Sequence, residues 1–269
     1  MPTIDAGGQK VYYVQRRPAP ARQPAVVLIH GAGGTHQQWL YQVRDLPAAA
    51  TFAPDLPGHG RSEGPGRTLV AAYGDWLLGF LDGLGLEKAV LAGHSMGGAI
   101  ALDVALRFPE RVAGLGLVAT GARLRVAPAI LDCLRQDPEE AIRLITQWSY
   151  GPEAPPEMVR LGRRQMAAGD PDVLHGDFVA CNVFDLRDRL GEIRAPAAIV
   201  CGTEDRMTPA RSATFLQENL PAASLHLVEG AGHMILLERP QAVVQALAGL
   251  LQTLEGPAAR PPSSRAPSP

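Results

Sequence analysis

The stretch AVLAGHSMGG, Ala89 to Gly98, determines the fold that we expect for this chain. Its first residues form a short apolar run typical of a buried strand, and helical spacing begins at Met96. Between them, Gly93-His94-Ser95-Met96-Gly97 fits the pattern G-x-S-x-G, which is informative in this strand-to-helix context. Such a turn forces strained backbone angles, and the flanking glycines let neighbouring chain pass without a Cβ clash. We therefore expect the Ser95 hydroxyl to project above a sheet as a candidate nucleophile.

Apolar, β-rich runs recur on both sides of this stretch, each followed by a segment with helical spacing. Strands that alternate with helices predict a mostly parallel sheet covered by helices on both faces, and unbroken apolar runs are typical of strands buried on both sides. The expected strands are VVLIH (Val26 to His30), TFAPD (Thr51 to Asp55), AVLAG (Ala89 to Gly93), LGLVA (Leu115 to Ala119), AAIVCG (Ala197 to Gly202) and LHLVE (Leu225 to Glu229). The run KVYYVQR, Lys10 to Arg16, alternates instead and is expected as an antiparallel edge strand. The expected helices cover residues 37–46, 69–84, 96–108, 210–220 and 240–254.

The alternation of strands and helices stops between residues 123 and 194, where helical patterns occur without any strand-like run. An unstructured loop of that length is uncommon inside a compact domain, so we expect a helical insertion, here called the cap. The predicted organisation is an α/β core over residues 1–122 and 191–254, a helical cap over residues 123–190 and a disordered tail over residues 255–269. The tail is rich in Pro, Ala and Ser and has too little apolar surface to order itself.

The composition is that of an ordinary globular protein and argues against several classes of function. The chain has 269 residues, 46% of them hydrophobic, and its net charge of -2 creates no field that would concentrate polyanions, so no nucleic-acid partner is expected. No run reaches the roughly 18 apolar residues of a spanning helix, and the start lacks the regions of a signal peptide; we expect no membrane partner and a cytoplasmic location. The 3 cysteines are widely spaced and no Walker A, G-x-G-x-x-G or H-E-x-x-H motif occurs, so no metal and no cofactor are expected.

A serine nucleophile needs a base within hydrogen-bond reach, and the base needs a carboxylate to orient it. His233 lies in the segment GAGHM and Asp205 lies in GTEDRMTP, and each segment follows an expected strand, where ligands of open α/β sheets bind. Taken singly, Asp205 could be an ordinary loop acid or a helix cap, and His233 could be a solvated residue. Glu204 is a competing acid. The coincidence of three signals in the chain order Ser95, Asp205, His233 favours a catalytic triad.

A second glycine-rich loop, His30-Gly31-Ala32-Gly33-Gly34, follows the first expected core strand. Such a loop can direct a backbone amide towards an oxyanion; we expect Ala32 to supply it, with Gly33 as the second choice and a simple turn as the alternative. The amide of Met96, at a helix N-terminus, is the other expected donor. The loop DLPGHGRS has side chains that we expect to shape the rim of the site without catalysing, namely Asp55, His59 and Arg61.

The remaining candidates concern the surroundings of the nucleophile. We expect His94, which precedes Ser95, to be structural. The expected substrate-binding residues are Gly33, Trp148, Met158, Phe178 and Met234. Met166, in the cap, is a further candidate. An apolar stripe at helical spacing is more often ordinary packing, and that alternative applies to every cap residue among them.

The motifs HGAGG, DLPGHGRS, GHSMGG, GTEDRMTP and GAGHMILLERP stand in the order found in the α/β-hydrolase superfamily, and the chain resembles its cap-bearing serine esterase branch. The resemblance covers about residues 26–254, apart from the variable cap. It implies a triad of Ser95, His233 and Asp205 and an oxyanion hole made by the amides of Met96 and Ala32. Serine as the nucleophile argues against epoxide hydrolases and haloalkane dehalogenases, which have aspartate there.

The resemblance leaves the substrate open, because the fold alone does not specify it. Carbon–carbon bond hydrolases of the superfamily usually have Asn before the serine and an aromatic residue soon after the histidine, where this chain has His94 and Met234. The expected function is therefore hydrolysis of small to medium carboxylic esters, with a small-molecule ester as partner. The alternatives are a lactonase, a carbon–carbon bond hydrolase of the same fold, or a ligand receptor with little turnover. The oligomeric state is not predicted.

Overall fold

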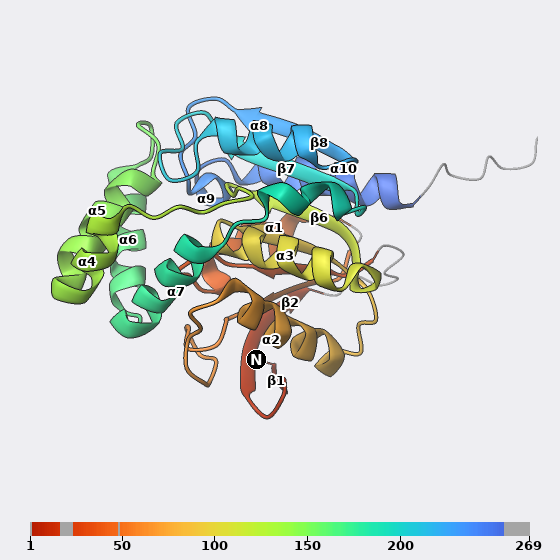
Figure 1. The fold of residues 1–269 in the computed structure, drawn as a ribbon, viewed down its shortest axis with the longest axis horizontal. Coiled ribbons are helices and arrows are strands. Elements are labelled where there is room, and N and C mark those ends of the chain that lie inside the picture. Colours follow the sequence, from red (N-terminus) through yellow and green to blue (C-terminus); the bar gives the residue numbers. More distant parts are fainter. Residues whose placement is uncertain (1, 17–23, 48, 256–269) are drawn as a thin grey trace, which may run out of the picture.

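The structure of this chain, a computed structural model, describes residues 2–16, 24–47 and 49–255. The expected tail over residues 255–269 lies outside the described residues, apart from Glu255. In the described part, helices pack against both faces of a central sheet, and a further group of helices stands to one side of it (Figure 1). This is the α/β class that the alternation of apolar runs and helical patterns predicts.

The described residues form an 8-stranded sheet in the order β1-β2-β4-β3-β5-β6-β7-β8. The strands are β1 Thr3–Asp5, β2 Lys10–Arg16, β3 Val26–Ile29, β4 Thr51–Pro54, β5 Ala89–His94, β6 Val112–Val118, β7 Ala197–Gly202 and β8 Ala223–Val228. β2 pairs antiparallel with β1 and β4, and the other pairs are parallel. The chain passes from β3 to β4 on one side and then to β5 on the other, so the strand order reverses at β3. Ligands bind beyond the carboxyl ends of strands at such a reversal.

The two edges of the sheet differ from the sequence-based expectation. β2 is antiparallel as predicted, but it is not an edge strand, because the short strand β1 pairs with it and places Thr3 opposite Tyr12. β8 was expected as a buried run, yet its residues alternate between exposed and half-buried, and Leu227 is 50% exposed. The reason is its position: β8 pairs only with β7, and helix packing reaches one of its faces. The central strands β3, β4, β5 and β7 are buried throughout.

Each face of the sheet packs against its own group of helices. One face is covered by α2 (Val70–Gly83), α3 (Met96–Arg107) and α8 (Ala210–Asn219), and the other by α1 (Leu40–Asp45), α9 (Ile235–Glu238) and α10 (Pro240–Leu254). The described residues also include the 3-10 helices η1 His36–Trp39, η2 Pro109–Arg111 and η3 Arg187–Glu192. Phe80 of α2 is fully buried on the first face and Val243 of α10 on the second. Burying such apolar surface contributes about 25 cal/mol per Å² and holds the three layers together.

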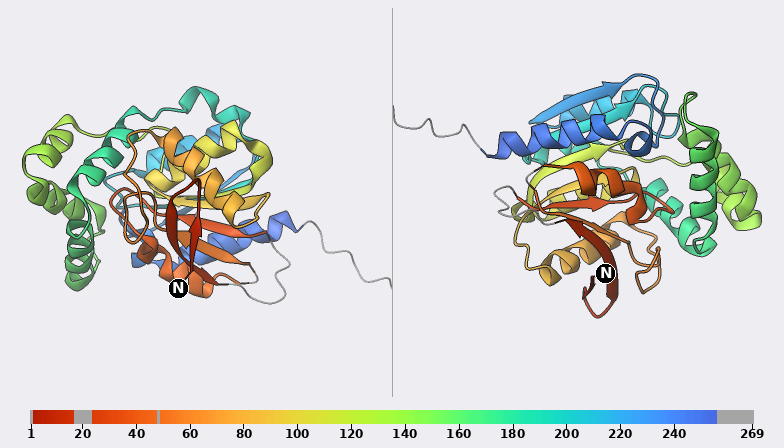
Figure 2. Two further views of the ribbon diagram at one scale, coloured as in Figure 1. Left: turned by 90° about the horizontal axis from the view of Figure 1, so that it is seen from below. Right: turned by 180° about the vertical axis from the view of Figure 1, so that it is seen from behind.

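Between β6 and β7 the chain forms α4 (Pro128–Gln136), α5 (Pro138–Ser149), α6 (Pro156–Ala167) and α7 (Pro171–Val183). Each of these helices begins at a proline, which fits the first turn because its missing N–H has no helical partner there. They lie within residues 123–190, for which we keep the name cap. Figures 1 and 2 show α4, α5 and α6 beside the sheet and α7 between them and the core, where it contacts α3. The cap has its own hydrophobic cluster, which includes Ile142, Leu174 and Phe178.

Candidate active site

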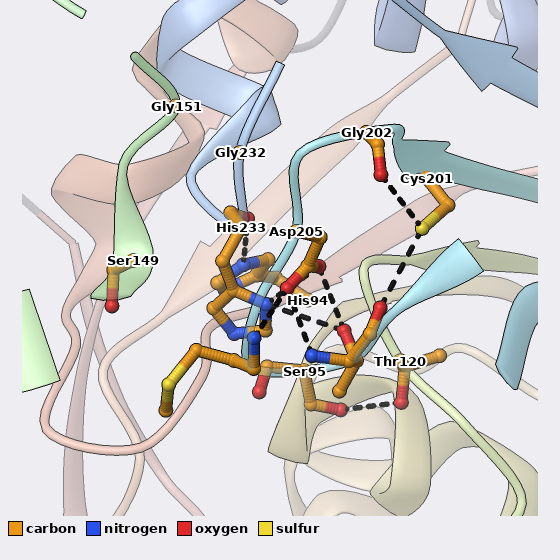
Figure 3. A network of polar contacts seen from close by, with 12 residues as sticks. His94, Ser95, Thr120, Ser149, Gly151, Cys201, Gly202, Asp205, Gly232 and His233 are labelled. Atoms are coloured by element: carbon orange, nitrogen blue, oxygen red, sulfur yellow. Dashed lines mark hydrogen bonds and ion pairs between the residues drawn. The ribbon is translucent and has the colours of Figure 1, made fainter. Parts of the chain in front are cut away.

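Ser95 stands at the turn between β5 and α3 with φ 52° and ψ -116°, a conformation that is uncommon for a residue with a side chain. Hydrogen bonds hold this strained backbone in place. The Ser95 N–H donates to Val118 O at 2.9 Å, and Thr120 Oγ1 donates to Ser95 O at 2.7 Å (Figure 3). The strained angles expected at this turn are therefore present, and neighbouring strand β6 stabilises them.

The two glycines of the G-x-S-x-G pattern are required by close contacts. A Cβ at Gly93 would overlap the backbone of Gly97 and Gly98, and a Cβ at Gly97 would overlap the carbonyl of Ile29. Without side chains at these positions, α3 can start directly against β3 and β5. This packing places the first amide of α3, that of Met96, beside the nucleophile.

The imidazole of His233 is oriented by Asp205. Its Nδ1 lies 2.9 Å from Asp205 Oδ2 and 3.3 Å from Thr208 Oγ1. Because an ionised carboxylate only accepts hydrogen bonds, Nδ1 carries the proton and Nε2 is left as a base. Figure 3 shows this pair gathered with Ser95. Ser95 and His233 line one cavity, but no hydrogen bond joins the Ser95 hydroxyl to the imidazole among the described residues; such bonds are often long before substrate binds.

Asp205 lies in the loop after β7 and is 4% exposed. Its Oδ1 accepts from the amides of Met207 and Thr208, both at 2.8 Å, and its Oδ2 accepts from Thr208 Oγ1 at 2.8 Å. Burial raises the pKa of Asp205, but the imidazole of His233 and these hydrogen bonds outweigh burial and hold the pKa below its ordinary value. Glu204, the competing acid, is exposed. The geometry thus favours Asp205 as the partner of His233.

His94 lies against the backbone of His233. Its Nε2 donates to the His233 carbonyl at 2.9 Å, and the two ring centroids are 4.8 Å apart. Burial, and next the neighbouring imidazole of His233, lower the pKa of His94 to about 3, so its ring is neutral. Its Nδ1 is buried and has no hydrogen-bond partner within the described ranges. A neutral, buried His94 that holds the His233 backbone agrees with the structural role expected for it.

The loop after β3 leaves one amide available beside the nucleophile. The other N–H groups of residues 31–34 are engaged, as Gly31 donates to Gln38 Oε1 at 3.1 Å, Gly33 to Asp177 Oδ2 at 2.8 Å and Gly34 to Gly31 O at 3.0 Å. The N–H groups of Ala32 and Met96 have no acceptor in the part of the chain that the structure describes. Two such amides next to Ser95 are the kind of donors that bind an oxyanion.

A cavity lies between the strand ends and the cap. From the core it is lined by Ser95, His233 and Ala32, together with Gln38, Met207 and Met234. From the cap it is lined by apolar side chains such as Ile145 and Phe178, and also by Arg123 and Arg125. The catalytic candidates therefore open into a mainly apolar space, which suits an acyl chain.

The structure separates the expected substrate-binding residues into two groups. Phe178, Met234 and Met166 line the cavity of Ser95, whereas Gly33, Trp148 and Met158 do not. Gly33 lines the cleft behind the loop, next to Leu174 and Met166. Trp148 packs against the hydrophobic cluster of the cap, and Met158 lines an outer groove between α6 and α1.

The reason for the difference between the two methionines of α6 is helix geometry. Met158, Leu161 and Gln165 are spaced so that they share the face over the outer groove, and Met166 falls on the face over the cavity. Helical periodicity predicts which residues share a face of α6, but it does not predict which face packs against the core.

The residues expected at the rim of the site, Asp55, His59 and Arg61, form hydrogen bonds that stabilise the loop after β4. Asp55 is fully buried; its Oδ1 accepts from the His36 N–H at 2.7 Å and its Oδ2 from the Arg61 N–H at 3.0 Å. Nε2 of His59 lies 2.8 Å from Asp177 of the cap. His59 and Arg61 line the cleft next to the cavity rather than the cavity of Ser95.

Two residues that hold the loop of residues 31–34 were not predicted from the sequence, namely Gln38 and Asp177. We call this loop the oxyanion loop after the role expected for its Ala32 amide. The signal for Asp177 exists in α7, where Leu174, Asp177, Phe178 and Cys181 are spaced as one buried helical face. An acid within an apolar stripe points to a buried partner. For Gln38, in a 3-10 helix of four residues, the sequence carries no comparable pattern.

Groups of three or more His, Cys, Asp or Glu side chains placed to hold a metal ion are not found among residues 2–16, 24–47 and 49–255. Over the same residues, the helices are too short or too polar to cross a bilayer.

Comparison with known proteins identifies the family. Residues 26–246 match the model of the alpha/beta hydrolase family. The chain is 33% identical over 254 residues to the dihydrolipoyllysine-residue acetyltransferase component of the acetoin cleaving system of Pseudomonas putida; the match covers 84% of this chain and 63% of that protein, less than two thirds of its length.

In two further comparisons, the matched region covers similar shares of this chain and of the related protein. The chain is 32% identical over 234 residues to the 2-hydroxy-6-oxononadienedioate/2-hydroxy-6-oxononatrienedioate hydrolase of Burkholderia vietnamiensis, which covers 78% of this chain and 80% of that protein. The solved structure of a thermophilic esterase matches with a TM-score of 0.81 and 34% identity, over 94% of this chain and 97% of that one. The chain is a member of the alpha/beta hydrolase family, and it is a hydrolase by that membership and by its esterase neighbours.

Proposed function

We propose that this hydrolase cleaves small to medium carboxylic esters through an acyl-enzyme formed on Ser95. One observation carries the proposal: His233, whose proton is directed to Nδ1 by Asp205, shares an apolar cavity with Ser95 and with the amide of Ala32. The likeness to a solved esterase, at 34% identity over 94% of the chain, supports an ester as the substrate.

In the proposed mechanism, Ser95, His233 and Asp205 act first in the formation of the acyl-enzyme and again in its hydrolysis. His233 Nε2 takes the proton of the Ser95 hydroxyl as Oγ attacks the ester carbonyl. The amides of Ala32 and Met96 stabilise the negative charge on the carbonyl oxygen, and the Asp205 carboxylate stabilises the positive ring. The imidazolium then gives its proton to the leaving alcohol. In the second half, His233 activates water, which hydrolyses the acyl-enzyme and restores Ser95.

The lining of the cavity supports a substrate with an apolar acyl chain. Small-molecule sites are typically concave, mostly apolar spaces with a few polar groups, as this one is. Ile145, Phe178 and Met166 supply apolar contacts for an acyl chain. The same reaction steps hydrolyse a lactone, whose alcohol stays attached to the acyl group.

A carbon–carbon bond hydrolase is the second candidate function. It is favoured by the likeness to the oxononadienedioate hydrolase of Burkholderia vietnamiensis, at 32% identity over 78% of this chain. The positions that usually distinguish that class carry His94 and Met234 here, which favours the ester.

The direct test is a p-nitrophenyl ester series from acetate to decanoate, measured with wild type, Ser95→Ala and the matched control Ser224→Ala, a serine on the exposed edge strand β8. We expect serine-dependent turnover with an optimum chain length in wild type and in the control, and loss of several orders of magnitude in kcat in Ser95→Ala. Near wild-type hydrolysis by Ser95→Ala would refute the nucleophile. No turnover by folded wild type would shift the assignment to a lactone, a carbon–carbon substrate or a ligand receptor.

A further inference from the structure

A carboxylate of the cap is completely buried against the loops of the core. Asp177, on α7, has no exposed surface. Its Oδ2 accepts from the Gly33 N–H and from His59 Nε2, both at 2.8 Å, and its Oδ1 accepts from the Tyr73 hydroxyl at 2.5 Å. The three donors come from the loop after β3, the loop after β4 and α2, so one cap side chain joins three core elements.

The partner His59 carries a positive charge in this arrangement. Its Nδ1 faces the carbonyl of Pro57 at 3.0 Å and its Nε2 faces Asp177, and both partners are acceptors, so both ring nitrogens donate. Burial lowers the pKa of His59, but the Asp177 carboxylate and these hydrogen bonds outweigh burial and raise the pKa above its ordinary value. Asp55, the neutral His30 and the Tyr73 phenol also face His59. A charged pair of this kind resists being opened, because separation would leave an unpaired charge in the interior.

In the oxyanion loop, the residues before and after Ala32 are both fixed by hydrogen bonds from their amides. Gln38 accepts from Gly31, the residue before Ala32, and Asp177 accepts from Gly33, the residue after it. Gly33 also has φ 61°, and a Cβ there would lie 2.5 Å from Leu174 Cδ1 of α7, so the loop fits closely under the cap. The direction of the Ala32 N–H therefore depends on the two contacts beside it.

We propose that Asp177 is a positioning residue that fixes the Ala32 amide by holding Gly33, and so couples the placement of the cap to the oxyanion hole. The proposal rests on the proposed acyl-transfer function, in which that amide stabilises the transition state. Asp177 does not line the cavity of Ser95, so it acts through the loop. The coupling makes catalysis depend on a docked α7.

The test compares Asp177→Asn, Asp177→Leu and the control Asn182→Ala. Asn182 lies on the same helix and accepts from Val126 at 3.2 Å, a contact within the cap. Asn at position 177 keeps one oxygen that can accept from Gly33, whereas Leu keeps none. Losing a preorganised oxyanion donor costs about 100-fold or more in kcat, so we expect a loss of about 100-fold for Asp177→Leu and a smaller loss, about 10-fold, for Asp177→Asn. KM for p-nitrophenyl butyrate stays within about twofold, because ground-state binding does not use the donor.

A second readout does not depend on turnover. Hydrogen–deuterium exchange of the peptide that contains residues 31–35 is measured in wild type, Asp177→Asn and Asn182→Ala. We expect faster exchange at Gly33 in Asp177→Asn and unchanged exchange in Asn182→Ala, because a neutral amide oxygen accepts more weakly than the carboxylate does. If Asp177→Leu does not fold, Asp177→Asn decides both readouts.

The outcomes separate this proposal from the proposed function. Unchanged kcat, a change confined to KM, or an equal loss of kcat in Asn182→Ala overturns the positioning role. If folded wild type hydrolyses no ester, the ester function fails and the exchange experiment alone decides: equal protection of Gly33 in wild type and Asp177→Asn overturns the hold on the loop, and lost protection supports it.

Discussion

The core side and the cap side of the cavity hold their functional groups in different ways. On the core side, Ser95, Asp205 and His233 each follow a strand of the parallel sheet, and each is fixed by several hydrogen bonds or by a close neighbour. On the cap side, the helices pack around their own cluster, and Asp177 reaches the core loops. From this comparison we infer that the proposed reaction chemistry belongs to the strand ends, whereas the fit of the substrate and the placement of the oxyanion loop depend on how the cap packs.

The largest effect is expected from the core side, in the variant Asp205→Asn. An amide at this position can donate to His233 Nδ1, which favours the wrong tautomer, and the analogous change in a serine protease triad lowers kcat about 10⁴-fold. We expect a loss of that order in kcat for a p-nitrophenyl ester with the fold intact by circular dichroism. The matched control is Glu204→Gln, the same chemical change at the exposed neighbour. Equal losses in the two variants would remove Asp205 from the triad.

The next effect is a loss of folding stability at acid pH, which we expect from His30 and not from His59 because their pKa values shift in opposite directions. Burial, and next the neighbouring His59, lower the pKa of His30 to about 4. Its unfolded pKa is about 6.5, so between these values only the unfolded chain binds the proton, and the free energy of unfolding falls as the pH drops through that window. We expect the protonation of His30 alone to lower the free energy of unfolding by about 3 kcal/mol between pH 7 and pH 4. His59, whose pKa is raised, contributes stability below about pH 6.5 that is lost as the pH rises above its folded pKa.

Urea unfolding at pH 7 and at pH 4.5 measures this window. We expect His30→Asn to lose less stability between the two pH values than wild type does. The control His226→Gln, on the exposed edge strand β8, should show the wild-type loss. The same loss in all three proteins would show that the buried imidazole does not cause the acid sensitivity.

A smaller effect is expected where the two sides meet, at Gly33. Gly33→Ala places a side chain at φ 61° and against Leu174 of the cap, so the oxyanion loop must shift. A misplacement of this kind costs about 10-fold or more in kcat. Gly85→Ala is the matched control, because Gly85 has φ 68° but nothing within 4 Å of the added Cβ. We expect the control to lose stability and keep its kcat. Equal kcat in both variants would contradict the contact between loop and cap.

The smallest effect is expected on the cap side, in the variant Met166→Ala. Met166 lines both the cavity of Ser95 and the neighbouring cleft, so its truncation joins the two spaces. We expect the optimum acyl chain to lengthen, with a change of about 5-fold in kcat/KM per substrate, the lower end of the roughly 1 to 3 kcal/mol that one pocket contact is worth. Met158→Ala, on the same helix but over the outer groove, should keep the wild-type chain-length profile. A profile altered equally by Met158→Ala would argue against Met166 as the dividing residue.

The core could be predicted from the sequence because its signals are local. The run before Ser95 predicts a buried strand, and the glycines at positions 93 and 97 predict the sharp turn that the structure contains. The parallel sheet and the α/β-hydrolase fold were predicted correctly. The predicted triad of Ser95, Asp205 and His233 is brought together in one place, and its catalytic role stays a prediction.

The cap could be predicted only as a set of helices. Periodicity indicates which residues of a helix share a face, but it does not indicate what that face meets. Trp148 and Met158 were therefore expected in the acyl pocket and lie elsewhere, and Asp177 was overlooked. The same limit applies at the sheet edge, where LHLVE has the composition of a buried strand but has only one neighbour.

The central claim is that Ser95 carries a covalent acyl group during turnover. The most direct measurement is intact and peptide mass spectrometry of wild type and Ser95→Ala after acid quench of a reaction with a p-nitrophenyl ester. We predict an added acyl mass on the wild-type peptide that contains Ser95 and none on Ser95→Ala. An acyl group on another residue, or turnover by Ser95→Ala with no adduct in either protein, would contradict the account.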